Sequence, residues 1–195
     1  VYVYDNAGGK YLDFLAGWCV GNVGWKQKDV IEAIKKEAER GLYVPPVFKF
    51  APWDEFASLL IQHAPNPALK RAVRCTSGSE AVEVAIKCAR AATNCTTIVS
   101  VKRVYHGHTY GAASVGDACT PNMSPGVPNM LKISMPDEFR GVRVSDALVE
   151  LENIFKTNHD VAAFLSEPVW TNAGVLVPPA DFYPKVAKLC KQYGI

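Results

Sequence analysis

The sequence from residue 72 onward alternates short runs of β-branched and apolar residues with longer segments of helical periodicity. The strand-like runs cover residues 72–76, 97–101, 131–133 and 161–165, and the helical segments cover residues 79–92, 145–156 and 181–193. Strands that alternate with helices pair in parallel and are connected by right-handed crossovers. The pattern therefore predicts an α/β fold with a mostly parallel sheet and helices on both faces.

The N-terminal part of the chain has a different pattern. Strand-type residues at 1–4 and 10–14 flank the turn sequence Asn6-Ala7-Gly8-Gly9, which predicts a β-hairpin. An amphipathic helix is expected from a cap at Asp29 to Gly41, and a second helix from Asp54 to the Pro-rich stretch at 65–67. We expect an N-terminal segment, residues 1–50, followed by part of a larger domain, residues 51–195.

Composition and charge narrow the class of protein. With 49% hydrophobic residues over 195 positions, the chain can bury a core, which excludes a disordered or fibrous protein. Lys and Arg number 21 against 19 Asp and Glu, and these charges form no basic stripe that would bind nucleic acid. Because no apolar run approaches the roughly 20 residues that span a bilayer, we expect neither a nucleic-acid nor a membrane partner.

The cysteines and the N-terminus indicate a cellular compartment. The six cysteines are irregularly spaced without a C-x-x-C pair, which predicts reduced core thiols and no zinc site or disulfide framework; they are Cys19, Cys75, Cys88, Cys95, Cys119 and Cys190. No secretory signal is visible in the first residues. We therefore expect a cytoplasmic protein, and the missing initiator Met suggests a chain that begins within a longer sequence.

The junction between a predicted strand and a predicted helix at Thr76-Ser77-Gly78-Ser79-Glu80 carries the clearest candidate site. Free backbone N–H groups and the positive end of the helix dipole favour an anion there, and Gly78 lets a ligand approach the backbone closely. Ser77 and Ser79 can add hydroxyl donors. The alternative is that a serine only caps the helix while Gly78 makes the turn.

Two further strand ends carry candidate binding residues. Tyr105-His106-Gly107-His108 follows the strand at 97–101, and Glu167 follows the strand at 161–165, so both are expected at the same carboxyl edge of the sheet. An aromatic ring at Tyr105 or His106 could stack on a flat heteroaromatic ligand. The alternatives are a metal site on the two histidines, which lacks a third ligand, or ordinary solvated residues.

Trp18 lies among small residues in the sequence Gly17-Trp18-Cys19-Val20-Gly21. Its side chain could anchor the core or form the wall of a pocket. Large aromatic side chains are mostly buried, so the sequence slightly favours the core.

These motifs together resemble the class III, pyridoxal-phosphate-dependent aminotransferases of fold type I. The resemblance rests on residues 4–25, 76–90, 105–107 and 166–179, and thus covers nearly the whole chain in order. It implies that Gly78 and Ser79 bind the phosphate of pyridoxal 5'-phosphate (PLP), that Tyr105 stacks on its ring and that His106 shapes the turn. It also implies that Glu167 lies near the ring and hydroxyl of the cofactor.

Trp18 matches an aromatic position that lines the substrate pocket in pyruvate-using ω-aminotransferases. At two places the chain departs from the family pattern. Trp25 stands where the family usually has a His, and Trp170-Thr171-Asn172 replaces a stretch that carries a Glu in many members that use 2-oxoglutarate. The second departure favours pyruvate as the acceptor.

The resemblance implies a partial enzyme. The Asp that pairs with the pyridine nitrogen and the Schiff-base Lys of the family are both missing from this sequence, so no catalytic residue is assigned, and residues 51–195 are expected to be part of a PLP-binding large domain. Residues 1–50 would belong to the small domain and dimer interface, with Trp18 and residues 43–50 contributing to a homodimer.

The function that the resemblance implies is transfer of an amino group from an ω-amino acid or amine to a 2-oxo acid such as pyruvate. One alternative is a PLP-dependent aminomutase, racemase or decarboxylase on the same scaffold. Another is a truncated product that only serves as a scaffold.

Overall fold

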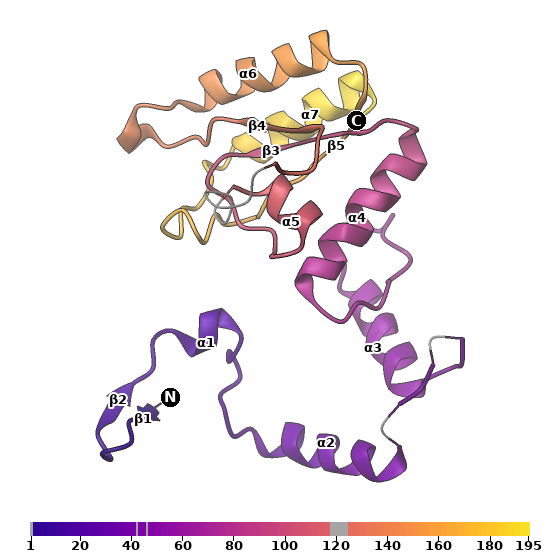
Figure 1. Ribbon diagram of the computed structural model, residues 1–195, viewed down its shortest axis with the longest axis vertical. Coiled ribbons are helices and arrows are strands. Elements are labelled where there is room, and N and C mark those ends of the chain that lie inside the picture. The colour runs from indigo at the N-terminus through magenta and orange to yellow at the C-terminus, as the bar shows by residue number, and fades with distance from the viewer. Residues whose placement is uncertain (1, 42, 46, 118–124) are drawn as a thin grey trace. The chain divides into compact units, whose positions relative to one another are not determined.

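The computed structural model describes residues 2–41, 43–45, 47–117 and 125–195 (Figure 1). The chain divides into two compact units, Val1–Ala72 and Val73–Ile195, which we call the first and second units. The division falls after Ala72, whereas the sequence suggested a domain boundary after residue 50. The assignment of residues 1–50 to a small domain and dimer interface stays a prediction.

The first unit begins with the expected β-hairpin. Strands β1 (Tyr2–Tyr4) and β2 (Lys10–Leu12) pair antiparallel, with Val3 opposite Tyr11. The Asp5 carboxylate holds the turn between them, because its Oδ1 accepts hydrogen bonds from the amides of Ala7 and Gly9. A short helical turn, α1 (Ala16–Cys19), follows the hairpin.

Two longer helices complete the first unit: α2 (Lys28–Arg40) and α3 (Ala51–Gln62). Both begin earlier than predicted. The expected cap at Asp29 is wrong, because Asp29 lies inside the first turn of α2, and Asp54, expected as the start of the second helix, lies inside the first turn of α3. There the negative charges of their side chains interact favourably with the positive end of the helix dipole, but the side chains do not cap the helix. Helix α3 starts ahead of Pro52, whose missing N–H costs nothing in a first turn.

None of the described residues of the first unit is buried. Its large apolar side chains are exposed, among them Ile34 of α2 and Phe56 of α3. The apolar face that made α2 recognisable in the sequence is therefore present but packs against nothing within this unit.

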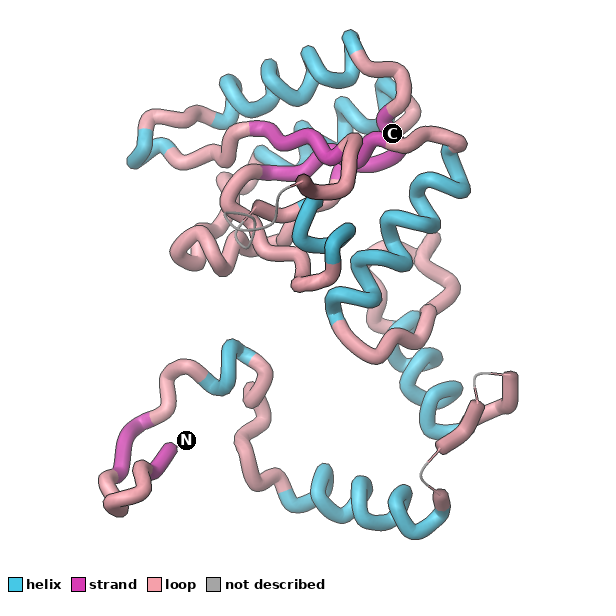
Figure 2. The backbone as a smooth tube through the Cα atoms, in the orientation of Figure 1, coloured by secondary structure: helices cyan, strands magenta, loops and turns pink. Residues whose placement is uncertain are grey.

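The second unit contains a three-stranded sheet in the order β4-β3-β5, and both strand pairings are parallel. Its elements are α4 (Gly78–Thr93), β3 (Thr97–Val101), α5 (Tyr110–Val115), β4 (Met130–Ile133), a 3-10 helix η2 (Glu138–Arg140), α6 (Val144–Thr157), β5 (Val161–Phe164) and α7 (Phe182–Tyr193). The predicted parallel α/β fold is confirmed. Figure 2 shows the strands between α6 and α5.

Helices cover both faces of this sheet, as predicted. Val99 and Val101 of β3 pack with the buried residues of α6 and α7, whereas Ile98 packs with Ile86 of α4 and Val115 of α5. Successive strand residues point to opposite faces, and every residue of β3 is buried. The sheet is thus the centre of the core, and its carboxyl edge is where the loops after β3 and β5 begin.

Two expectations, one about the strands and one about the cysteines, are wrong. Residues 72–76 form no strand and pair with no described strand, because β-type composition alone does not create a hydrogen-bonded neighbour. Helix α5 lies in a stretch for which the sequence pattern predicted no element, because its small residues show no amphipathic pattern. The five described cysteines are free thiols, but none is buried. Cys119 lies outside the described residues.

Candidate functional site

The N-terminus of α4 is the first component of the candidate site. Ser77 is the N-cap residue, and its Oγ accepts a hydrogen bond of 3.1 Å from the amide of Glu80. Glu80 in turn accepts a 2.6 Å bond from the amide of Thr76, so the chain enters the helix along a fixed path. The capping role considered for a serine is therefore confirmed for Ser77.

Gly78 leaves space open at this helix end. A Cβ built on Gly78 would meet no atom within 4 Å among the described residues. The amides of Gly78 and Ser79 belong to the first turn, where N–H groups have no acceptor within the helix. A helix N-terminus with free amides and free space is the geometry that accepts a phosphate.

The loop of residues 105–108, which we call the aromatic loop, packs directly on this helix end. The amide of His108 donates a 3.1 Å hydrogen bond to Ser79 Oγ. Gly107 has a φ of +137°, and a Cβ there would lie 2.5 Å from Ser79 Oγ and 2.9 Å from Ser79 Cα. Only glycine fits such a close approach, so Gly107 is what brings the loop to α4.

Within the loop, the Tyr105 ring meets the His108 ring edge to face, with centroids 5.4 Å apart. This arrangement is the favourable one for two aromatic side chains. It orients Tyr105 next to the amide that His108 uses to bind Ser79.

Glu83, one turn beyond Ser79 on α4, holds the other end of the aromatic loop. Its Oε1 accepts hydrogen bonds from Thr109 Oγ1 at 2.6 Å, from the Gly111 amide at 2.9 Å and from the Ala112 amide at 3.1 Å. The carboxylate therefore caps the N-terminus of α5. Sequence analysis missed this residue, although its spacing of four from Ser79 places both on one face of a helix.

Glu167 joins the end of β5 to the aromatic loop. Its Oε1 accepts a 2.9 Å bond from the Tyr105 amide, and its Oε2 accepts bonds from the Thr171 amide and hydroxyl at 3.2 and 2.7 Å. Both carboxylate oxygens are thus engaged with the chain itself. The hydroxyl of Tyr183 also donates to the backbone oxygen of Glu167.

The turn that carries Glu167 is anchored in the core. Trp170 is fully buried, packs against Phe182 and Tyr183 of α7, and donates from Nε1 to Ser166 Oγ. Trp170 also exchanges backbone hydrogen bonds with Leu176. The position of Glu167 is therefore set by the packing of α7.

His106 is the one histidine of the loop that is buried, with 9% of its surface exposed. Nothing in the described part of the chain forms a hydrogen bond with its Nε2. Burial lowers the pKa of His106 below its ordinary value, with Glu167 opposing the shift and Lys132 adding to it. Burial thus favours the neutral form of the ring, and Nε2 is a buried polar atom without a hydrogen-bond partner among the described residues.

The metal site considered for His106 and His108 would need a third ligand, and none lies near them among the described residues. Across the residues that the structure describes, no three His, Cys, Asp or Glu side chains gather as a metal site requires. The helices of the described ranges also include none that is long and apolar enough to cross a membrane.

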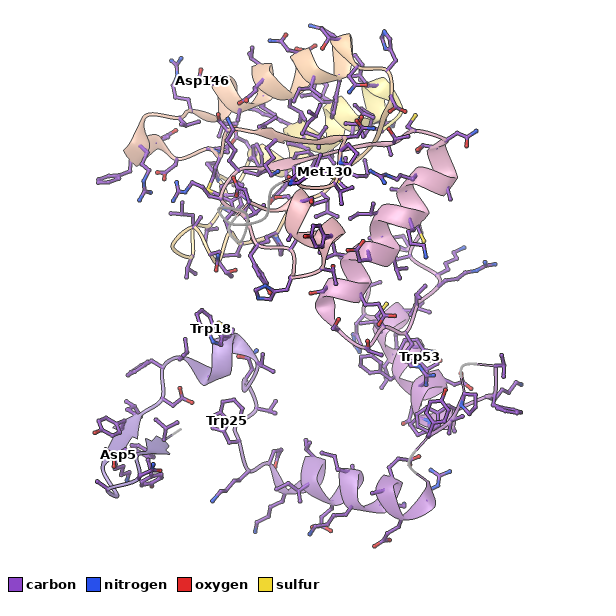
Figure 3. The ribbon with its side chains drawn as sticks, viewed as in Figure 1. Asp5, Trp18, Trp25, Trp53, Met130 and Asp146 are labelled. Atoms are coloured by element: carbon purple, nitrogen blue, oxygen red, sulfur yellow. The ribbon has the colours of Figure 1, made fainter. Side chains whose placement is uncertain are left out.

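Trp18 belongs to the first unit, whereas the residues above belong to the second. It projects from the turn of α1 (Figure 3), and 79% of its surface is exposed. The interpretation of Trp18 as a core anchor is wrong, because its turn places it outward among small residues that cannot enclose it. The structure thus links Gly78, Ser79, Tyr105, His106 and Glu167 through α4 and the aromatic loop, and leaves Trp18 as a separate element.

The fold and this site define a parallel α/β protein in which the loops after two strands converge on the N-terminus of a helix, at the edge where such proteins bind ligands. Comparison with known proteins identifies the family. The sequence model described as "Aminotransferase class-III" matches residues 1–195, and the chain belongs to the class III aminotransferase family.

Individual relatives agree with this family. The chain is 34% identical to acetylornithine aminotransferase of Methanopyrus kandleri over 99% of its length and 47% of the relative's. It is 31% identical to isoleucine 2-epimerase of Lentilactobacillus buchneri over 98% of its length and 46% of that protein. The ω-transaminase of Pseudomonas jessenii, solved in complex with PMP, superposes with a TM-score of 0.92 at 27% identity, covering 100% of this chain and 47% of that one. The chain spans about half the length of the curated relatives it matches.

Proposed function

We propose that the complete protein is a PLP-dependent aminotransferase that moves an amino group from an ω-amino acid or amine to a 2-oxo acid such as pyruvate. Membership of the class III family supports this reaction class. The observation that carries the proposal is the open N-terminus of α4, where Gly78 faces free space and the aromatic loop is held beside it by Ser79.

The residues present fit such a cofactor. The amides of Gly78 and Ser79 would bind the phosphate, and the ring of Tyr105 would stack on the pyridine. The buried Nε2 of His106 has no hydrogen-bond partner among the described residues. It is therefore available to a polar ligand bound beside it. When bound, PLP supplies the electron sink for amino-group chemistry, and the residues of this chain bind and orient it.

In this proposal Glu167 lies near the cofactor and also positions Tyr105. Because both its oxygens bind the chain, it fixes the backbone of Tyr105 and thereby the stacking ring. Its negative charge lies close enough to His106 to favour the protonated imidazole, against the effect of burial.

The turn at residues 170–172 supports pyruvate as the acceptor. Trp170 is buried in the core, and the Thr171 hydroxyl is bound to Glu167. The family resemblance implies that many enzymes that use 2-oxoglutarate carry a Glu in this stretch, which switches against an arginine. Neither Trp170 nor Thr171 has a carboxylate that could do so. An acceptor without a second carboxylate therefore suits this turn better.

We further propose that the protein acts in the cytoplasm as a homodimer with its active sites at the subunit interface. The exposed apolar residues of the first unit support a partner surface, since a large part of their surface is left uncovered by that unit. Trp18 would line the substrate pocket, and residues 43–50 would contribute to the interface.

The test uses the complete protein with PLP, an amine donor and pyruvate, and measures alanine formed together with the PLP dissociation constant. A size series at Gly78, Ala then Leu, should leave circular dichroism unchanged because a Cβ meets no atom within 4 Å. The same series should weaken PLP binding progressively, because the side chain enters the phosphate space. Unaltered PLP affinity in Gly78→Leu would remove the phosphate assignment, and absence of amine-dependent alanine would remove the proposed reaction.

A second candidate is an amino-acid racemase or epimerase, which the similarity to isoleucine 2-epimerase favours. Such an enzyme needs no external 2-oxo acid. Incubating single-enantiomer amino acids with the holoenzyme and no acceptor, then analysing chirality, separates the two reactions.

A further inference from the structure

The turn of α1 has a left-handed backbone. Ala16, Gly17, Trp18 and Cys19 have φ angles of 47°, 58°, 62° and 65°. Three of these residues are not glycine, and L-residues disfavour this conformation because Cβ crowds the following carbonyl oxygen. The turn therefore needs support from outside itself.

Asp13 and Trp25 provide that support. Asp13 Oδ1 accepts hydrogen bonds from the amides of Leu15 at 3.0 Å and Ala16 at 2.8 Å, at the start of the turn. Its Oδ2 accepts a 2.8 Å bond from Trp25 Nε1. The carboxylate thus ties the indole to the residue where the left-handed conformation begins.

The Trp25 ring is also packed on two glycines of the turn. A Cβ built on Gly17 would lie 2.4 Å from Trp25 Cη2, and one built on Gly21 would lie 2.9 Å from Trp25 Cζ2. The indole therefore occupies the space that side chains at both positions would need. Trp25 is also the residue that stands where the family resemblance implies a His.

Trp18 depends on the turn for its direction. Since 79% of its surface is exposed, contacts with neighbours within the first unit do little to fix the side chain, and its backbone sets where it points. Whatever holds residues 16–19 in the left-handed conformation also determines the reach of the Trp18 ring.

We infer that Asp13 and Trp25 are positioning residues that hold Trp18 in place as a wall of the amine-donor pocket and so set the size of donor accepted. This inference rests on the proposed function, in which Trp18 lines the substrate site. The two residues touch no substrate and act only through the turn.

The hairpin supplies a matched control. Asp5 accepts two backbone amides through Oδ1, from Ala7 and Gly9, and one aromatic donor through Oδ2, the hydroxyl of Tyr11 at 2.8 Å. This is the bonding pattern of Asp13, but it holds an ordinary hairpin turn. Asp5→Asn and Tyr11→Phe therefore perturb the first unit in the same chemical way without touching residues 16–19.

The experiment compares Asp13→Asn with Asp5→Asn in the complete holoenzyme. Asn keeps an oxygen for the two amides but presents an NH2 group that cannot accept from Trp25 Nε1. With pyruvate as acceptor, kcat and KM are measured for isopropylamine and for the larger α-methylbenzylamine. We expect the ratio of the two kcat/KM values to change about tenfold in Asp13→Asn. A pocket distinguishes two substrates that differ by one methylene by roughly this factor. The kcat for isopropylamine should stay near wild type, and Asp5→Asn should leave the ratio unchanged.

A rescue experiment tests the packing contact. Gly21 does not have a left-handed φ, so the obstacle to Gly21→Ala is the Trp25 ring alone. We expect Gly21→Ala to shift the donor ratio and the double variant Gly21→Ala/Trp25→Phe to lie closer to wild type than either single variant. Additive effects would overturn the role of this contact.

A structural measurement makes the outcomes distinguishable. The amides of Cys19, Val20 and Gly21 close the turn through bonds to Leu15 and Ala16, and their hydrogen exchange should accelerate in Asp13→Asn but not in Asp5→Asn. Unchanged exchange and an unchanged donor ratio in an active Asp13→Asn enzyme would overturn this inference and leave the proposed function intact. A wild-type holoenzyme without transaminase activity would overturn the proposed function itself.

Discussion

At the scale of single residues, the site depends on positions where one atom more would prevent the fold. Gly107 is the clearest, because its missing side chain lets the aromatic loop lie against Ser79. Gly111 is a milder case, since a Cβ there would meet the Glu83 carboxylate, the end of a flexible side chain that would have to shift away from α5. Gly107 lies in the connection between β3 and α5, and Gly111 lies in the first turn of α5.

Gly107→Ala in the complete protein should displace the aromatic loop and raise the PLP dissociation constant at least tenfold. The new Cβ would collide with Ser79 and would also carry an unfavourable φ of +137°. Gly141→Ala separates the two causes, because Gly141 has a φ of +78° with no atom within 4 Å. If both variants lose the same PLP affinity, the close approach to Ser79 is not what matters.

His106 gives the apo protein a stability that depends on pH. Its folded pKa is lowered, mainly by burial, so the unfolded state takes up a proton at higher pH than the folded state does. Its contribution is present above the unfolded pKa of about 6.5 and is lost as pH falls through the folded pKa. Urea unfolding of wild type and His106→Gln between about pH 7 and pH 5 should show a shallower loss of stability in the variant. Equal slopes would contradict this, and exposed His159 provides the control substitution.

The sequence predicted part of this site and missed part of it for a physical reason. Gly78, Ser79, Tyr105 and Glu167 could be selected because each follows or begins an element whose direction the pattern of residues reveals. Glu83 could not, because its partners Thr109 and Gly111 come from a segment with no recognisable periodicity. Trp18 was expected in the core because large aromatic side chains are usually buried. Its exposure depends on a left-handed turn that cannot be predicted from the residue types.

At the scale of elements, α4 positions the aromatic loop from two points on one face. Ser79 binds the loop at His108, and Glu83 binds it at Thr109 and at the start of α5. Helix α5 has only six residues, which is too short to be stable without support. The contact with Glu83 therefore stabilises α5 as well as the aromatic loop.

Glu83→Ala should lower the free energy of unfolding by about 2 kcal/mol, because three hydrogen bonds to one charged group are lost. Hydrogen exchange at the Gly111 and Ala112 amides should accelerate, and denaturant unfolding measures the energy. Glu32→Ala serves as the comparison, since its exposed ion pair with Lys35 contributes little. Equal effects of the two substitutions would contradict a cap at α5.

The elements themselves were largely predictable. Helices α2, α4, α6 and α7 follow from helical periodicity, and strands β3, β4 and β5 follow from short runs of β-branched and apolar residues between them. The strand expected at 72–76 was not formed, since a strand requires a neighbour and composition does not supply one. The start of α3 was shifted by Pro52, which is tolerated at a helix start although it usually marks an end.

At the scale of the whole molecule, the two units differ in how they are stabilised. The second unit has a sheet with a buried cluster on each face, whereas the described part of the first unit buries no residue. Hydrophobic burial is the main stabilising contribution in folding. The first unit therefore depends on surfaces that it does not itself contain.

This difference predicts how the two units exchange hydrogen. In the 195-residue chain, amides of α2 should exchange much faster than those of β3, because no buried contact protects the helix. In the homodimer that we propose for the complete protein, a partner surface would cover the apolar face of α2, and α2 should become protected. Protection of α2 equal to that of β3 in the shorter chain would show that the first unit is stable alone.

The close approach of Gly107 to Ser79 also affects how a gene of this kind can diversify. A larger side chain at either position has no room unless the other segment moves, so substitutions at the two sites cannot accumulate independently. Recombination with a breakpoint between codons 79 and 107 joins halves that fit only if both parents keep this contact. Trp18, which we propose as a pocket wall, takes no part in this contact, so in that proposal substrate preference is free to change while residues 79 and 107 are inherited as a pair.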